Sequence, residues 1–164
     1  MRLLPAAALL AALSAVPAQA CVAKTPCNIA AAKRAIVATK LRMKLLGPDA
    51  MQVAPSRVDR VLCHDFTRDG RTDIAVTIAS GGTAGDVGFA VFRATSAGWQ
   101  VALARNGYKL GLFRVGGDPV SSQPVYKQND PNCCPSGGFD HLRFHWNGKR
   151  FVVARSWHTR SFKP

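Results

Sequence analysis

The sequence predicts an α+β domain in which one N-terminal helix packs on a mostly antiparallel β-sheet of six to eight strands, stapled by disulfides. Two observations predict this class. A single stretch with helical periodicity comes early, and after residue 56 short apolar runs alternate with glycine-rich or Asp-Gly turns. The chain of 164 residues also contains five cysteines, enough for two crosslinks.

Residues 1–20 have the pattern of a secretory signal peptide. Met1-Arg2 form a short positive start, residues 3–16 are mostly apolar, and residues 17–20 offer small side chains for cleavage. Cleavage would leave residues 21–164 as one secreted or periplasmic domain. The alternative is a lipoprotein anchored through Cys21, although Gln19 fits the usual lipobox poorly. We find no second apolar stretch of about 18 residues, and therefore expect no transmembrane segment.

The strongly basic composition favours anionic partners. The formal net charge is +13, and removal of Arg2 with the leader would lower it to +12. We expect an anionic envelope polymer, a membrane surface or another exported protein as the partner, and export argues against nucleic acid. The alternative is that the basic side chains are spread over solvated faces and serve solubility.

The first element of the mature chain is predicted to be a helix from Cys27 to Leu46. Thr25-Pro26 has the pattern of an N-cap followed by proline at the first helical position, and Gly47-Pro48 would stop the helix. One face is apolar, and a basic stripe at helical spacing contains Lys33, Lys40 and Lys44. We expect this stripe to face solvent, with contact to an acidic membrane surface as the alternative.

The rest of the chain is predicted to be strands. They cover residues 58–62, 74–79, 87–95, 99–104, 108–115 and 120–126, followed by a hairpin of residues 139–146 and 149–157. Asn147-Gly148 predicts a type I′ turn for this hairpin, which places Phe144 opposite Phe151. Leu142, Phe144 and Trp146 should then face the core. His141 and His145 would lie about 13 Å apart along the strand, too far to share one metal ion.

An acidic loop between the first two strands is the main candidate site. Asp65, Asp69 and Asp73 occupy loop positions one, five and nine, and Gly70 at position six allows a sharp turn. Calcium prefers six to eight oxygen ligands, which these carboxylates, the Thr67 hydroxyl and the Arg71 carbonyl could supply. The alternative is a metal-free turn at Asp69-Gly70, with Asp65 and Asp73 paired to arginines.

This loop resembles the calcium loop of the FG-GAP or VCBS repeats of integrin-like β-propellers, in which Asp-x-Asn/Asp-x-Asp-Gly-x-x-Asp precedes a hydrophobic strand. Thr67 replaces the usual Asn or Asp, and the motif occurs once, whereas a propeller needs several blades. The chain also resembles uncharacterised exported proteins of high-GC bacteria in residues 65–73, 81–83 and 130–138. A weaker resemblance is to small actinobacterial envelope lipoproteins. None of these resemblances implies a known activity.

A turn-rich loop at residues 129–138 carries the adjacent cysteines Cys133 and Cys134. Because a ring closed by two adjacent cysteines is strained, we expect them to pair with Cys63 and Cys27, in either order. The bridge to Cys63 would close a loop of about 70 residues and stabilise the fold by about 4 kcal/mol. The alternative is a vicinal redox switch. The sequence argues against it, because no basic residue lies directly beside the two cysteines to lower the pKa of a thiol.

The sequence contains no recognisable catalytic motif, so no catalytic residue and no organic cofactor are assigned. We predict a non-catalytic exported binding or structural module with a loop that could hold calcium. One alternative is a hydrolase of an anionic envelope polymer, with a carboxylate of the acidic loop or Asp130 as general base. Another is an inhibitor or adhesion partner that contacts a second exported protein through the Cys133-Cys134 loop.

Overall fold

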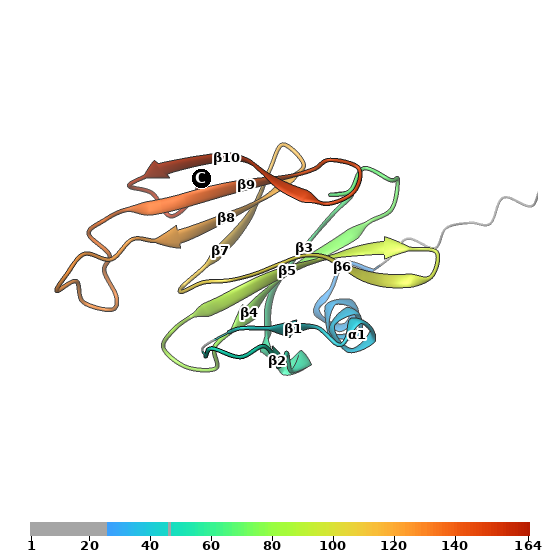
Figure 1. The fold of residues 1–164 in the computed structure, drawn as a ribbon, viewed down its shortest axis with the longest axis horizontal. Helices are drawn as coiled ribbons and strands as arrows, with labels where there is room; N and C mark the ends of the chain where they lie inside the picture. The colour runs from blue at the N-terminus through green and yellow to red at the C-terminus, as the bar shows by residue number, and fades with distance from the viewer. Residues whose placement is uncertain (1–25, 46) are drawn as a thin grey trace, which may run out of the picture.

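A computed structural model describes residues 26–45 and 47–164, which form three layers (Figure 1). The signal peptide and Cys21 lie outside the described residues, so both remain predictions. None of the described helices is long and apolar enough to cross a membrane. The elements are α1 (Ile29–Thr39), β1 (Arg42–Met43), β2 (Met51–Gln52), the 3-10 helix η1 (Pro55–Arg57), β3 (Val58–His64), β4 (Asp73–Ala79), β5 (Asp86–Thr95), β6 (Gly98–Asn106), β7 (Gly111–Val115), β8 (Asp118–Pro124), β9 (Phe139–Trp146) and β10 (Phe151–Thr159).

Two four-stranded antiparallel sheets form the body of the molecule. Sheet I has the order β3-β4-β5-β6, sheet II has the order β10-β9-β8-β7, and β1 and β2 pair separately. Sheet I is the middle layer, with α1 and the β1–β2 segment on one face and sheet II on the other (Figure 1). The predicted α+β class is therefore confirmed, but the strands form two facing sheets rather than one.

Strands β4 and β5 are buried on both faces because they lie at the centre of the middle layer. Ile74, Val76 and Ile78 pack against α1, whereas Ala75 and the neighbouring Phe89 pack against sheet II. A strand covered on both sides needs apolar residues at successive positions instead of strict alternation. The run Ile74-Ala75-Val76-Thr77-Ile78 has this composition, and all five residues are buried.

The helix is shorter than predicted at both ends. It begins after Asn28, whose Oδ1 accepts a hydrogen bond from the N–H of Ala31 at 2.8 Å, and it ends at Thr39, with Lys40 in a left-handed conformation (φ 50°). Beyond the helix, Leu41, Met43 and Leu45 are buried and alternate with exposed Arg42 and Lys44. The predicted basic stripe does not form along the helix, because only Lys33 is helical, Lys40 is the C-cap and Lys44 lies beyond it.

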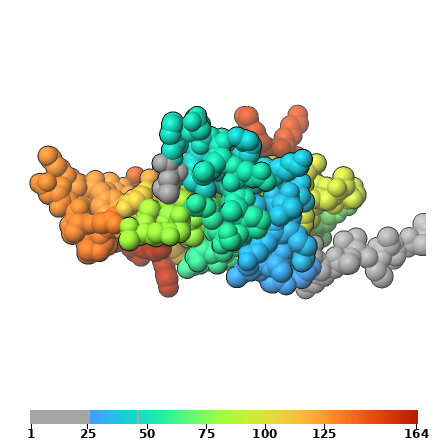
Figure 2. All heavy atoms as spheres, turned by 90° about the horizontal axis from the view of Figure 1, so that it is seen from below, coloured from blue at the N-terminus to red at the C-terminus, as the bar shows by residue number. Residues whose placement is uncertain are grey.

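The segment that leaves the helix completes the outer layer. Its buried side chains join those of α1 in one apolar cluster against sheet I. Figure 2, viewed from below, shows α1 and this segment (blue to teal) spread over the face of the molecule. Over only five residues, the Leu-x-Met-x-Leu pattern is compatible with a helix as well as with an extended strand. This ambiguity explains why the end of the helix was predicted too late.

The C-terminal hairpin has a different register from the predicted one. The Oδ1 atom of Asn147 accepts hydrogen bonds from the N–H groups of Lys149 and Arg150, both at 3.0 Å, and Trp146 pairs with Phe151. The connection therefore has four residues instead of two, so that Phe144 lies opposite Val153, not Phe151. The predicted packing of Leu142, Phe144 and Trp146 into the core is confirmed.

The predicted disulfide pairing was wrong. Cys27 pairs with Cys63, which joins the residue before the N-cap of α1 to β3, and their Cα atoms lie 5.8 Å apart. Cys133 pairs with its neighbour Cys134. All four cysteines that were expected to form bridges do so, but the adjacent pair makes no connection to a distant part of the chain.

Candidate functional site

The acidic loop is a turn in which the carboxylates accept hydrogen bonds from N–H and side-chain groups of the protein itself. Asp65 accepts hydrogen bonds from the N–H groups of Asp69 and Gly70 at 3.0 and 2.8 Å. Asp69 accepts from the N–H of Arg71 at 3.1 Å and pairs with Arg93 at 2.9 Å. The turn needs Gly70, whose φ of +81° favours glycine.

Asp73 is fully buried and connects the loop to the next hairpin. It accepts hydrogen bonds from the N–H and hydroxyl of Thr67, at 2.8 and 2.9 Å, and from the N–H of Ala94 at 3.0 Å. Burial, the dominant cause, raises the pKa of this carboxyl. In residues 26–45 and 47–164, no group of three or more His, Cys, Asp or Glu is placed to hold a metal ion. Calcium binding by this loop is untested, and the hydrogen bonds to its carboxylates favour the metal-free turn that was the alternative to a calcium site.

We expect millimolar calcium to leave the melting temperature unchanged, because Asp65, Asp69 and Asp73 already accept hydrogen bonds from the protein. A bound ion would instead raise the melting temperature with the logarithm of the excess calcium concentration. Differential scanning fluorimetry after treatment with a chelator measures this directly. A calcium-dependent rise that is lost in Asp69→Asn would restore the predicted site.

An ion-pair cluster closes the sandwich at the end that carries the acidic loop. Asp118 is 1% exposed, and its carboxylate lies 2.8 Å from Arg143, 3.3 Å from Arg68 and 3.4 Å from His145. Arg68 belongs to the β3–β4 connection, whereas Asp118 and Arg143 belong to sheet II. The cluster therefore joins the two sheets. Figure 1 shows the β3–β4 connection and the loop after β8 at opposite ends of the molecule.

A cleft of about 670 Å³ lies between the sheets at the other end, next to the loop after β8. Phe89, Leu110 and Leu142 give it apolar walls. The polar side chains that line it come from both sheets: Arg105 and Asn106 from β6, and Ser121, Gln123, Asp140, Ser156 and His158 from sheet II. Ligand pockets in proteins have this size and this combination of apolar walls with a few polar groups.

Two features of the cleft bear on its chemistry. The Arg105 guanidinium lies 5.5 Å from the centroid of the Phe144 ring and, among the described residues, has no carboxylate within 4.0 Å. His158 Nδ1 lies 2.8 Å from Asp140 Oδ1, and both side chains are more than half exposed. The cleft thus holds one unpaired cation and one His–Asp pair.

Asp130, a predicted alternative base, is engaged in its own loop. Its Oδ2 atom accepts hydrogen bonds from the N–H groups of Ser136 and Lys127, both at 2.7 Å. These bonds, with the Ser136 N–H as the largest cause, lower the pKa of the Asp130 carboxyl. A carboxylate stabilised in this way is a weaker base, so Asp130 is poorly suited to that role.

Another buried polar group with an altered pKa is His141, on the outer side of sheet II. Its ring lies 2.6 Å from the Ser122 hydroxyl and 2.7 Å from the Thr159 hydroxyl, and it stacks on Trp157. Burial is the main cause that lowers the pKa of this imidazole. His141 is therefore a buried histidine with both ring nitrogens hydrogen-bonded, as expected for a structural residue.

No protein-family model matches the chain, and no curated protein or solved structure is significantly similar to it. The resemblance to FG-GAP repeats and to exported bacterial proteins therefore stays a prediction. Neither Arg105 nor His158 was predicted to be a site residue. The four-residue turn at Asn147 and the bulge between Val153 and Arg155 together place His158 opposite Asp140, and no sequence signal places Arg105 opposite them.

Proposed function

We propose that the protein is a non-catalytic exported binding module whose cleft between the sheets takes a small anionic organic ligand, such as an acidic sugar unit of an envelope polymer. The unpaired Arg105 guanidinium carries this proposal. An arginine beside an aromatic face, with apolar walls nearby, can donate two parallel hydrogen bonds to a carboxylate or phosphate. Gln123 and Asn106 add amide groups that can bind sugar hydroxyls.

The distribution of charge supports an anionic ligand. The chain has 22 basic and nine acidic residues. The carboxylates of six of these acidic residues accept hydrogen bonds or form ion pairs within the protein, namely Asp65, Asp69, Asp73, Asp118, Asp130 and Asp140. Few carboxylates are left to balance the exposed basic side chains, so the field around the protein should attract anions and raise their association rate.

The test compares Arg105→Gln with Arg34→Gln, which removes the same charge from the exposed side of α1. Isothermal titration calorimetry with glucuronate and with neutral glucose measures binding to each variant. We expect Arg105→Gln to weaken glucuronate binding roughly tenfold or more, the usual size of one charge-assisted hydrogen bond, and Arg34→Gln to have little effect. Equal losses in both variants, equal binding of glucose, or no glucuronate binding to the unaltered protein would contradict the proposal.

The hydrolase alternative is favoured by one observation, the Asp140–His158 pair in the same cleft. A carboxylate that orients an imidazole is a common arrangement for general-base catalysis. No described Ser, Thr or Cys side chain hydrogen-bonds to His158, so water would be the nucleophile. Release of reducing ends from an acidic polysaccharide, lost in His158→Asn with ligand binding retained, would support this alternative over a binding module.

A further inference from the structure

The two disulfides differ in what they can do for stability. Cys27 and Cys63 are 36 positions apart, whereas Cys133 and Cys134 are adjacent in the sequence. In the chain-entropy model, a bridge stabilises the fold because it closes a loop in the unfolded chain, and the effect grows with the length of that loop. The bridge between Cys133 and Cys134 closes no such loop. Restriction of the unfolded chain therefore does not explain why Cys133 and Cys134 form a bridge.

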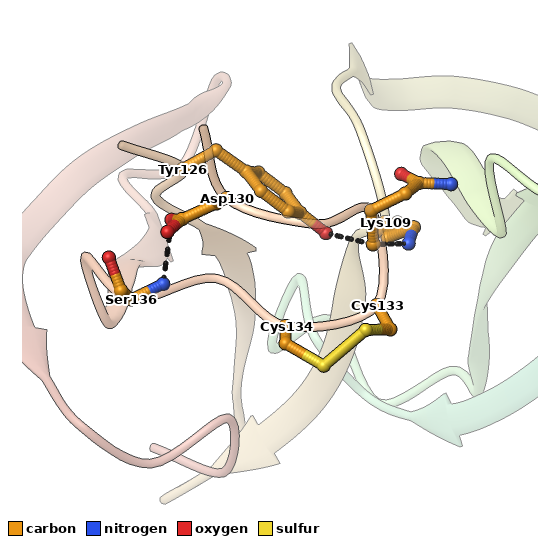
Figure 3. Close-up of a disulfide and its surroundings, with 7 residues drawn as sticks. Lys109, Tyr126, Asp130, Cys133, Cys134 and Ser136 are labelled. Carbon is orange, nitrogen blue, oxygen red and sulfur yellow. Dashed lines mark hydrogen bonds between the residues drawn. A yellow bond between two sulfur atoms is a disulfide. The ribbon is translucent and has the colours of Figure 1, made fainter. Parts of the chain in front are cut away.

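The loop that carries this bridge is held by other contacts. Asn132 is the common acceptor of hydrogen bonds from Tyr108, Lys109 and Tyr126, and the Tyr126 bond to its carbonyl measures 2.8 Å. Asp130 joins the two sides of the loop, because it accepts hydrogen bonds from the N–H of Lys127 and from the N–H of Ser136, the second of which is drawn in Figure 3. These bonds involve no sulfur atom, so the loop should keep its position when the bridge opens.

The surroundings favour reaction at the bridge. Cys133 and Cys134 are both exposed, and so are Pro131 and Asn132 before them. The Lys109 ammonium donates to the Asn132 carbonyl, directly before Cys133, and lies 5.5 and 5.8 Å from the ring centroids of Tyr108 and Tyr126. A fixed positive charge beside a thiol favours its thiolate form, and a more acidic thiol is a better leaving group in disulfide exchange. This charge comes from a distant part of the sequence.

We propose that Cys133-Cys134 is a reversible thiol–disulfide exchange site that accepts two electrons from a dithiol of a partner protein. A partner thiolate attacks one sulfur, the bond between Cys133 and Cys134 breaks, and the other cysteine leaves as a thiolate. The second partner thiol then displaces the first cysteine from the mixed disulfide. The net change is a dithiol on this chain and a disulfide on the partner, with two electrons and two protons transferred. The proposal does not depend on the function of the cleft.

The test uses dithiothreitol as the dithiol. The folded protein is equilibrated with increasing concentrations, free thiols are blocked with N-ethylmaleimide, and peptides are identified by mass spectrometry. We expect Cys133 and Cys134 to be blocked together at concentrations that leave Cys27–Cys63 intact, with an unchanged circular dichroism spectrum. Opening of the adjacent pair only together with Cys27–Cys63, or only when the fold is lost, would overturn the proposal.

A pair of lysine variants tests the role of the neighbouring charge. Lys109→Met should slow reduction by dithiothreitol several-fold at neutral pH, because it removes the ammonium that favours the leaving thiolate. Lys127→Met is the matched control, since it removes an exposed charge from the same loop. The melting temperature of each variant shows whether the loop stays in place. Equal rates in Lys109→Met and the unaltered protein would overturn the assignment of Lys109 to this site.

Discussion

Replacement of both Cys27 and Cys63 by serine should lower the free energy of unfolding by about 4 kcal/mol. The bridge spans 36 positions, for which the chain-entropy model gives a loss of this size. It ties the start of α1 to β3, and Cys63 packs against the apolar cluster between α1 and sheet I. We expect the melting temperature to fall by roughly 10 °C, the usual conversion for a domain of this length.

The matched control is the double variant Cys133→Ser/Cys134→Ser, which removes the same number of sulfur atoms from a bridge that closes no loop. Urea unfolding of both variants, followed by tryptophan fluorescence and circular dichroism, gives the two free energies. We expect the control to stay close to the unaltered protein. Equal losses in the two double variants would mean that loop closure is not the source of the stabilisation.

The sequence predicted which cysteines form bridges but not which cysteines pair with each other. The expected export and the number of cysteines predicted that four of them form bridges, and the four expected residues do. Which residues pair depends on distances set by the tertiary fold. Cys27 comes within bonding distance of Cys63 because α1 lies across sheet I and contacts both of its edge strands, β3 and β6, and no local pattern near either cysteine encodes that approach.

The strands were more predictable than their arrangement. The apolar run of β4 and the Asp-Gly and Asn-Gly turns mark segments that do form strands and turns. The division into two sheets was not predictable, because every strand of each sheet pairs with its neighbours in the sequence. The chain passes from β6 to β7 through residues 107–110 by a connection as short as a hairpin loop, yet those two strands belong to different sheets.

The cleft depends on two features that the sequence did not predict, the stacking of the two sheets and the register of the C-terminal hairpin. Arg105 lies on β6 of sheet I, and His158 lies on β10 of sheet II, so only the stacking of the sheets brings them to one cavity. The position of His158 opposite Asp140 further depends on the turn at Asn147 and on the bulge between Val153 and Arg155. The predicted two-residue turn, without this bulge, would have placed Arg155 opposite Asp140 instead.

The second large effect is expected for Asp118→Asn, which should lower the free energy of unfolding by about 2–3 kcal/mol. Removing one partner of a fully buried ion pair typically costs 3–5 kcal/mol, because the other charge stays buried without compensation. Here Arg143 and Arg68 are 35% and 55% exposed, so water can partly replace the carboxylate and the loss should be smaller. Chemical denaturation at moderate salt concentration measures it.

The partners of Asp118 provide the internal controls. Arg68→Met removes the more exposed cation and leaves Arg143 paired, so we expect a loss below about 1 kcal/mol. In the double variant Asp118→Asn/Arg143→Gln, the uncompensated charge at Arg143 is also removed, and part of the stability should return. If Asp118→Asn costs no more than Arg68→Met, the buried carboxylate is not what holds the two sheets together at this end. The closed end of the sandwich would then depend on apolar contacts such as those of Phe66.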